Sequence, residues 1–116
     1  MDQELCKLTL VYPIDAEDRV LELLLESQPP LGGFATWRAE GHGQDFTHAS
    51  VAERVRGRVS RGMLVMVQER NRIDRLLSEI GSVAPIAHLA YWLEPVLEFG
   101  RMRAIAQHSG PTDTGP

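Results

Sequence analysis

Arginine side chains are concentrated in the middle of the chain, where they could bind an oxyanion. The stretch from position 42 to position 62 carries four of them, Arg54, Arg56, Arg58 and Arg61. A guanidinium group presents planar, forked donors that match a carboxylate, a bicarbonate or a phosphate. We place the binding role foremost at Arg56, Gly57 and Arg58, because the two arginines flank a glycine. The alternative is a solvated, charged surface without a ligand.

A short glycine-rich step comes before the arginines. Gly41, His42, Gly43 and Gln44 follow one another in the chain. Glycine tolerates backbone conformations that other residues avoid, so this step can act as a hinge with exposed amides. The Gln44 side chain can donate to a carbonyl or phosphate oxygen. We therefore predict that these four residues contact an effector, the alternative being a simple strand end.

Histidine and cysteine side chains raise the question of a metal site. Soft metals favour the ligand atoms of His42, His48, His88 and Cys6. No two of them have the spacing of a zinc finger. His88 lies among apolar residues in a predicted strand, which favours a core or interface histidine. We predict no metal site and keep His42 and His48 as the candidates should one exist.

His48 could instead take part in a hydrolytic active site. Asp45, His48 and Ser50 carry the atoms of a catalytic triad. All three lie on one segment, without the sharp turn that presents a nucleophile. Hydrolysis needs a preorganised site, so we predict that the protein is not an enzyme and has no catalytic residue.

The elements that must position these residues follow from the pattern of apolar side chains. Strands are predicted at residues 5–12, 34–40, 57–68 and 86–93. Stripes at helical spacing predict one helix capped by Asp15 and a second capped by Asn71 and ended by Gly81. The first stripe is Val20, Leu21, Leu24 and Leu25, and the second is Ile73, Leu76, Leu77 and Ile80. This order predicts an α+β fold, a ferredoxin-like βαββαβ sandwich with both helices on one sheet face.

The opposite sheet face must also be covered. Residues 86–93 are apolar on both sides of the strand and residues 57–68 nearly so, a pattern typical of strands buried on both faces. Either the segment "VLEFGRM" folds over this face or another subunit does. We predict an oligomer, because one short segment covers only part of a four-stranded sheet. Trp37, Tyr91 and Trp92 are expected in the core or at this contact.

The connection between the second and third strands is unusually long. Neighbouring strands of a hairpin are normally joined by about 2 to 5 residues, whereas here the connection runs over residues 41–56. Long loops in compact domains are functional or disordered. We predict a functional loop that is mobile without its ligand.

Composition excludes several classes of function. Apolar residues make up 43% and charged residues 24%, as in ordinary globular domains. The net charge of -4 argues against nucleic-acid binding, which needs a basic surface. No apolar run approaches the roughly 20 residues of a membrane span, and the single cysteine, Cys6, suits a reducing compartment. We predict a cytoplasmic protein without membrane insertion, with one domain at residues 1–107 and a disordered tail at residues 108–116.

Residues in and around the long connection resemble those of the PII-like family of trimeric signalling proteins. "GFATWRAEGHGQ", residues 33–44, is similar to the stretch that enters the family's long loop between strands two and three. "RVRGR", residues 54–58, is similar to the exit of that loop. The strings "GHG", "SVAERVRGR" and "YWLEPVLEFGRM" resemble, in order and spacing, a PII-like subgroup encoded beside heavy-metal efflux pumps of the resistance-nodulation-division type.

The resemblance implies a homotrimer that binds an effector in the clefts between subunits. Arg101 and Arg103 are similar to the paired arginines with which PII proteins reach a bound phosphate, the alternative being a charged tail. The effectors expected are ADP, AMP, ATP or bicarbonate. Nucleotide-binding PII proteins carry a glycine- and lysine-rich loop before strand four, whereas this chain has "IGSVAPIAH", with one glycine and no lysine. We therefore expect a smaller anion, or a nucleotide held mainly by arginines.

Three functions follow from these observations. The first is a non-enzymatic regulator whose effector orders the loop and so changes its contact with a membrane transporter, an efflux system or another partner. The second is a metal-binding or metal-tolerance protein that uses the loop histidines, similar to the trimeric divalent-cation tolerance proteins. The third is a structural oligomer without a ligand. We favour the first.

Overall fold

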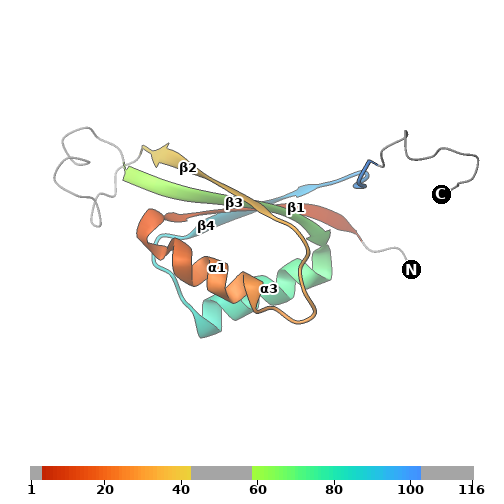
Figure 1. Cartoon of the computed structure of the whole chain (residues 1–116), viewed down its shortest axis with the longest axis horizontal. Helices are drawn as coiled ribbons and strands as arrows, with labels where there is room; N and C mark the ends of the chain where they lie inside the picture. The colour runs from red at the N-terminus through yellow and green to blue at the C-terminus, as the bar shows by residue number, and fades with distance from the viewer. Residues whose placement is uncertain (1–3, 43–58, 103–116) are drawn as a thin grey trace, which may run out of the picture.

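The computed structural model describes residues 4–42 and 59–102 of the 116-residue chain. Its elements are β1 (Leu5–Pro13), the 3-10 turn η1 (Ile14–Ala16), α1 (Glu17–Leu25), β2 (Ala35–Gly41), β3 (Val59–Glu69), α3 (Arg70–Val83) and β4 (Ala90–Pro95). The strands form one antiparallel sheet in the order β2-β3-β1-β4. Both helices lie on the same side of that sheet (Figure 1). The predicted α+β, ferredoxin-like βαββαβ fold is confirmed.

The core lies between the sheet and the two helices. Alternation along β1 turns Leu8, Leu10 and Tyr12 toward the helices, and each has 0% of its surface exposed. The buried cluster around them also contains Cys6, Val20, Leu24, Leu31, Leu64, Met66, Ile73, Leu76 and Ile80. The central strands β1 and β3 thus supply one wall of the core, and the predicted helical stripes supply the other.

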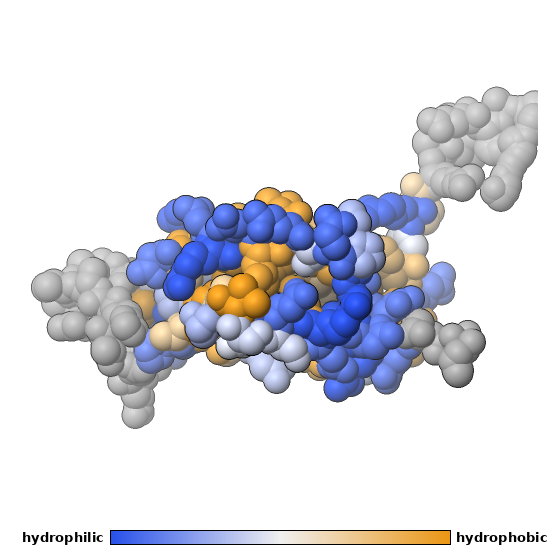
Figure 2. Space-filling model, turned by 90° about the horizontal axis from the view of Figure 1, so that it is seen from below, coloured by the Kyte–Doolittle hydropathy of each residue, from blue (hydrophilic) through white to orange (hydrophobic). Residues whose placement is uncertain are grey.

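Both helices are amphipathic. The inner face of α1 buries Val20 and Leu24, and that of α3 buries Ile73, Leu76 and Ile80. Seen from the helix side, the surface is hydrophilic along most of its length and has an apolar zone near its middle (Figure 2). No helix among the described residues is long and apolar enough to cross a membrane.

Several details at the helices differ from the prediction. Asp15 does not cap α1, because the chain enters this helix through η1, and neither start has a side-chain cap hydrogen bond. Asn71 lies inside α3, which begins at Arg70. Gly81 does not end α3 but lies in its last turn, where no atom stands within 4 Å of the place that a Cβ would take. Leu25 is 73% exposed rather than buried.

The fourth strand begins later than predicted. The expected range was 86–93, but β4 spans Ala90–Pro95 because a turn precedes it. In that turn His88 has a φ of 62°, in the left-handed region that breaks an extended strand. His88 is therefore exposed on a turn, so the expected core position is wrong, and the alternative position at an interface stays a prediction. Pro95 remains paired with Cys6, which an edge strand tolerates.

A hydrogen bond from Tyr12 joins the end of β1 to the start of α1. Its hydroxyl donates to Glu17 Oε2 over 2.8 Å, although the side chain is fully buried. The ring lies against Gly62, the residue directly opposite on β3. Burial, and then the hydrogen bond to Glu17, raise the pKa of Tyr12 well above its usual range. Tyr12 is therefore a buried polar anchor rather than a simple apolar core residue.

Replacing Tyr12 with phenylalanine is expected to lower the free energy of unfolding by about 1 kcal/mol, because one hydrogen bond is lost while the ring remains. The substitution should also change the response to alkali. In the unfolded wild type Tyr12 ionises near pH 10, whereas the folded state keeps the proton because its pKa is raised. Wild-type stability should therefore fall as the pH rises above about 10, and the Tyr12→Phe protein should lose less. Urea unfolding between pH 8 and pH 11 measures both effects; equal slopes in the two proteins would contradict this role.

The sheet face opposite the helices is apolar and open. Two neighbouring rows cross all four strands in register: Ala35, Val65, Thr9 and Trp92 in one, and Trp37, Met63, Val11 and Ala90 in the other. Trp37 is 46% exposed and Trp92 is 45% exposed, one at each edge of the sheet. An ion pair between Lys7 and Glu94, at 3.6 Å, lies in the next row. We call these two rows the open face.

The segment after β4 does not bury the open face. Leu97 and Met102 are 102% and 94% exposed, so neither packs on the sheet. The Val96 amide instead donates to the Leu5 carbonyl over 3.1 Å. Beyond it, Phe99 and Arg101 lie beside the start of β2. Within the described residues this segment therefore leaves most of the open face uncovered, although Phe99 and Arg101 stand beside its residues Ala35 and Val65, and a second subunit remains the prediction.

Candidate functional site

A hollow opens where the chain enters β2. Its lining residues come from the approach to β2, the second half of β3 and the segment after β4: Leu31, Gly32, Gly33, Phe34, Ala35, Val65, Met66, Val67, Gln68, Phe99 and Arg101. Its volume is about 510 Å³, within the range of small-molecule sites. The wall is mostly apolar, with a few polar groups at the rim, as such sites commonly are.

The approach to β2 is fixed by local contacts. Gly32 has a φ of 84°, in the left-handed region that favours glycine. The Gln68 side-chain amide donates to the Leu31 carbonyl over 2.6 Å, which joins this turn to the end of β3. Leu31 is itself 7% exposed. The wall of the hollow formed by the approach to β2 is therefore fixed by the burial of Leu31 in the core and by the hydrogen bond from Gln68.

Arg101 is the charged group of the hollow. Its guanidinium carbon lies 5.9 Å from the centre of the Phe99 ring, close enough for a cation-π contact. Its Nη2 lies beside Gly33, 3.5 Å from where a Cβ would stand. The Phe99 ring is 52% exposed. A cation next to an accessible aromatic ring suits an anion that also carries a flat apolar part.

The other predicted effector residues within the described chain lie at the far end of β2. Gly41 ends that strand and His42 follows it in an exposed position. At about 3.3 Å per residue, Ala35 and Gly41 are roughly 20 Å apart. The structure therefore does not bring Gly41 and His42 together with Arg101 in one chain.

Gly41 has a packing role that its sequence context did not reveal. A Cβ at this position would lie 3.1 Å from Cγ of Arg61 and 3.3 Å from its Nε. The Arg61 side chain thus lies across Gly41 at the base of the connection, and it is half-buried. Of the four central arginines, Arg61 is the one whose position the structure describes.

The remaining predicted site residues lie outside the described part of the chain. They are Gly43, Gln44, Arg56, Gly57, Arg58 and Arg103, and the candidate metal ligand His48 lies there too. Within residues 4–42 and 59–102, no group of three or more His, Cys, Asp or Glu side chains could hold a metal ion. The metal question therefore stays a prediction.

Of the residues that line the hollow, only Arg101 was predicted as a site residue; Phe99 and Gln68 are among those missed. Phe99 stands two positions before Arg101, a spacing that places both side chains on one side of an extended segment, so alternation could have shown it. Gln68 carried no such signal, because its partner Leu31 lies 37 positions away along the chain.

The described residues have an α+β, ferredoxin-like fold, with both helices on one face of a four-stranded antiparallel sheet (Figure 1). The chain belongs to the DUF3240 family, described as "Protein of unknown function (DUF3240)", whose model matches residues 1–103. A comparison with curated proteins gives no match.

Solved structures show the same fold at low sequence identity. A DUF3240 family protein from Shewanella baltica OS155 is 19% identical with a TM-score of 0.68, over 89% of this chain and 100% of that one. A candidate PII-like signalling protein from Thermus thermophilus is 18% identical with a TM-score of 0.53, over 83% and 91%. A functionally unknown protein from Pediococcus pentosaceus is 8% identical with a TM-score of 0.59, over 87% and 100%.

Proposed function

We propose that the protein is a non-enzymatic PII-like regulator that binds a small anionic effector. The observation that carries the proposal is the hollow in which Arg101 stands beside Gly33 and the Phe99 ring. Likeness of fold to the Thermus thermophilus protein, whose own description is PII-like signalling, supports the regulatory class. The effector is an adenine nucleotide (ADP, AMP or ATP) or bicarbonate.

The proposed effector site lies between subunits of a homotrimer. In one chain Arg101 and Gly41 lie at opposite ends of β2. Packing of the open faces of two copies can bring the start of β2 of one copy near the connection at residues 41–56 of another. Arg101 and Arg103 of one copy would then face His42, Gln44, Arg56 and Arg58 of its neighbour. The two groups of predicted residues would form one site only in the assembly.

The proposed output is a change in the connection at residues 41–56. An effector that contacts Gly41, Gly43 and Gly57 favours the ordered form of this connection. The equilibrium toward the ordered form shifts only as far as the effector binds that form more tightly than the other. The ordered connection would then bind a transporter or an efflux-system partner in the cytoplasm. The folded unit is the domain at residues 1–107, and residues 108–116 take no part.

Replacing Arg101 with glutamine is expected to weaken effector binding at least tenfold, because a hydrogen bond to a charged group contributes about 1.5–3 kcal/mol. Thermal unfolding with ADP, AMP, ATP or bicarbonate measures this. A ligand at about 100 times its dissociation constant adds about 2.7 kcal/mol to the wild type. Arg38→Gln is the matched control, since Arg38 is an exposed arginine of β2 that does not line the hollow.

A second variant distinguishes the classes of effector. Phe99→Leu removes the aromatic face but keeps apolar volume, so it should weaken a nucleotide and leave bicarbonate unchanged. Binding of every ligand by Arg101→Gln as tightly as by the wild type would contradict the proposal. So would an absence of stabilisation of the wild type by all four ligands.

A further inference from the structure

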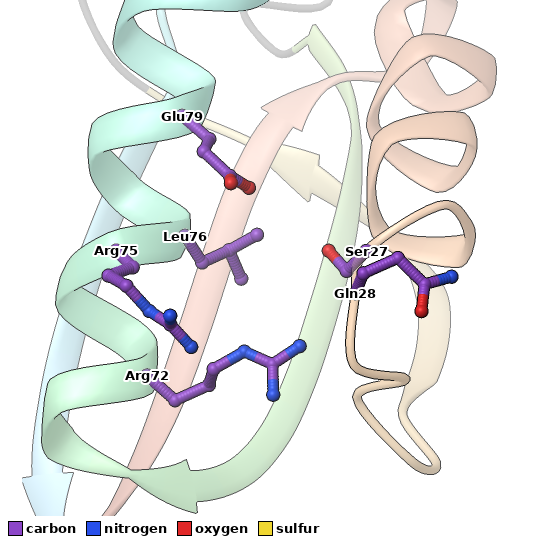
Figure 3. Close-up of a pocket in the computed structure, with 6 residues that line it drawn as sticks. All are labelled: Ser27, Gln28, Arg72, Arg75, Leu76 and Glu79. Atoms are coloured by element: carbon purple, nitrogen blue, oxygen red, sulfur yellow. The ribbon is translucent and has the colours of Figure 1, made fainter.

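A second hollow lies between α1 and α3, on the helix side of the molecule. Its lining residues are Ser27, Gln28, Arg72, Arg75, Leu76 and Glu79 (Figure 3). Its volume is about 30 Å³, room for roughly two water molecules or one small ion. None of its polar residues lines the hollow at β2. We call it the interhelical cleft.

Arg72 is held across the interhelical cleft by the loop after α1. Its Nη2 donates to the Pro29 carbonyl. A guanidinium group has five N–H donors, so most of those on Arg72 remain for another acceptor. The side chain is half-buried as well as tethered. A donor fixed in this way loses less conformational entropy when it binds a ligand.

Arg75 stands one turn further along α3 and has a different environment. Within residues 4–42 and 59–102 it makes no hydrogen bond or ion pair. Arg70, on the other side of the helix, is by contrast paired with Asp74 at 3.2 Å. In Figure 3 the guanidinium groups of Arg72 and Arg75 extend from α3 toward the same cleft. Within the part of the chain that the structure describes, neither of these two positive charges is paired with a carboxylate, which favours an anion between them.

The other lining groups limit what the anion can be. Glu79 adds one negative charge to the cleft, so that the two arginines and this glutamate together carry a net charge of +1. The Ser27 hydroxyl donates to the Leu23 carbonyl over 3.4 Å, so its proton is already used. Gln28 turns its amide away from the arginines in Figure 3. The arginines therefore supply the donors, and the small volume excludes a whole nucleotide.

We propose that Arg72 and Arg75 bind a small phosphate-type oxyanion in the interhelical cleft. Guanidinium donors match the oxygens of phosphate. The same chemistry is offered by inorganic phosphate and by the phosphomonoester headgroup of a lipid. The site lies on the helix side, away from the open face and from the hollow with Arg101. It therefore does not depend on the regulator proposed above.

Calorimetric titration of the full chain with inorganic phosphate tests the site through two substitutions that are expected to change the phosphate affinity in opposite directions. Arg75→Gln is expected to weaken phosphate binding about tenfold or more, because it removes a charged donor. Glu79→Gln is expected to strengthen it several-fold, because it removes a like charge from the cleft. Arg38→Gln is the control that should bind phosphate as the wild type does, since Arg38 lines neither hollow. Arg72→Gln is not used alone, because Arg72 also holds the loop at Pro29.

Flotation with phosphatidylcholine vesicles, with and without phosphatidic acid, separates the two sources of phosphate. Binding of free phosphate that depends on Arg75 supports the site with a soluble ligand. Binding only to vesicles that contain phosphatidic acid, again lost in Arg75→Gln, supports the site with a lipid headgroup. An Arg75→Gln protein that binds both probes as the wild type does would overturn the proposal, and so would a wild type that binds neither.

Discussion

Replacing Trp37 and Trp92 with glutamate is expected to turn an assembled protein into single chains. Each tryptophan stands at one edge of the open face, and about half of each is exposed in the single chain. A tryptophan that an interface buries fully commonly contributes about 2 kcal/mol or more. A glutamate in the same place would also bury an unpaired charge. In sedimentation equilibrium the mass should fall from three times to once the chain mass of 12.9 kDa.

The same strand provides a matched control for this experiment. Tyr91 is 53% exposed, but its partner in the sheet is Leu10, which places it on the helix side, whereas Trp92 is paired with Thr9 on the open face. Tyr91→Glu should therefore leave the mass unchanged. Circular dichroism must show that the double variant is folded. A monomeric wild type would contradict the predicted assembly, and a double variant that stays trimeric would show that another surface holds the subunits.

The fold could be predicted from the sequence because the core residues of each strand and helix recur at the spacing typical of that element. Leu8 and Leu10 alternate on β1, and Ile73, Leu76 and Ile80 repeat at helical spacing on α3; each of these is buried. The errors lie at element ends. Asp15 and Asn71 are good capping residues by type, yet the chain begins α1 through a 3-10 turn and α3 at Arg70. Residue type reports a tendency to cap, while the path of the preceding strand decides where the helix starts.

The candidate site was predictable only in part. Arg101 was predicted because arginine chemistry and the resemblance to PII-like proteins pointed to it; the structure shows that it lines a hollow, and its binding role stays a prediction. Its neighbours Gly33 and Gln68 depend on long-range contacts, between segments far apart in the sequence. Tertiary contacts of this kind leave no periodic signal. For the same reason Gly41 was assigned to effector binding, whereas the structure shows that it also makes room for Arg61.

Tyr91 and Trp92 show why burial on both faces could not be decided from one strand. Both side chains are apolar, and their alternation predicts opposite faces, which the register confirms. The sheet, however, extends past the helices at its edges, so that most residues of β2 and β4 remain exposed in the single chain. An apolar pattern states that a face will be covered; it does not state by which chain. Burial of the open-face side of β4 therefore depends on the assembly, whereas its helix side, where Tyr91 is 53% exposed, is covered less than the apolar pattern predicted.

Gly62→Ala is expected to cause the largest loss of stability of any single methyl group added to a described glycine. A Cβ at this position would lie 2.3 Å from Cε1 of Tyr12 and 2.8 Å from its Cζ, closer than atoms can approach. The ring cannot move away cheaply, because it is fully buried and its hydroxyl is hydrogen bonded to Glu17. Overpacking of a well-packed core typically costs about 1–3 kcal/mol, and loss of the Tyr12 hydrogen bond adds about 1 kcal/mol. We expect a total loss of about 2–4 kcal/mol, a large part of the roughly 5–15 kcal/mol that stabilises a typical domain.

Urea unfolding at one fixed protein concentration measures the stability lost in Gly62→Ala. The same measurement on a control substitution is expected to show a gain in stability. Gly81→Ala adds the same methyl group inside α3, where no atom lies within 4 Å, and should raise stability by about 0.5–1 kcal/mol. Combining Gly62→Ala with Tyr12→Leu should cost less than the sum of the two single changes, because the smaller side chain leaves room for the methyl group. Full additivity of the pair, or a Gly62→Ala protein within about 0.5 kcal/mol of the wild type, would show that the contact between Tyr12 and Gly62 does not limit the packing of β1 against β3.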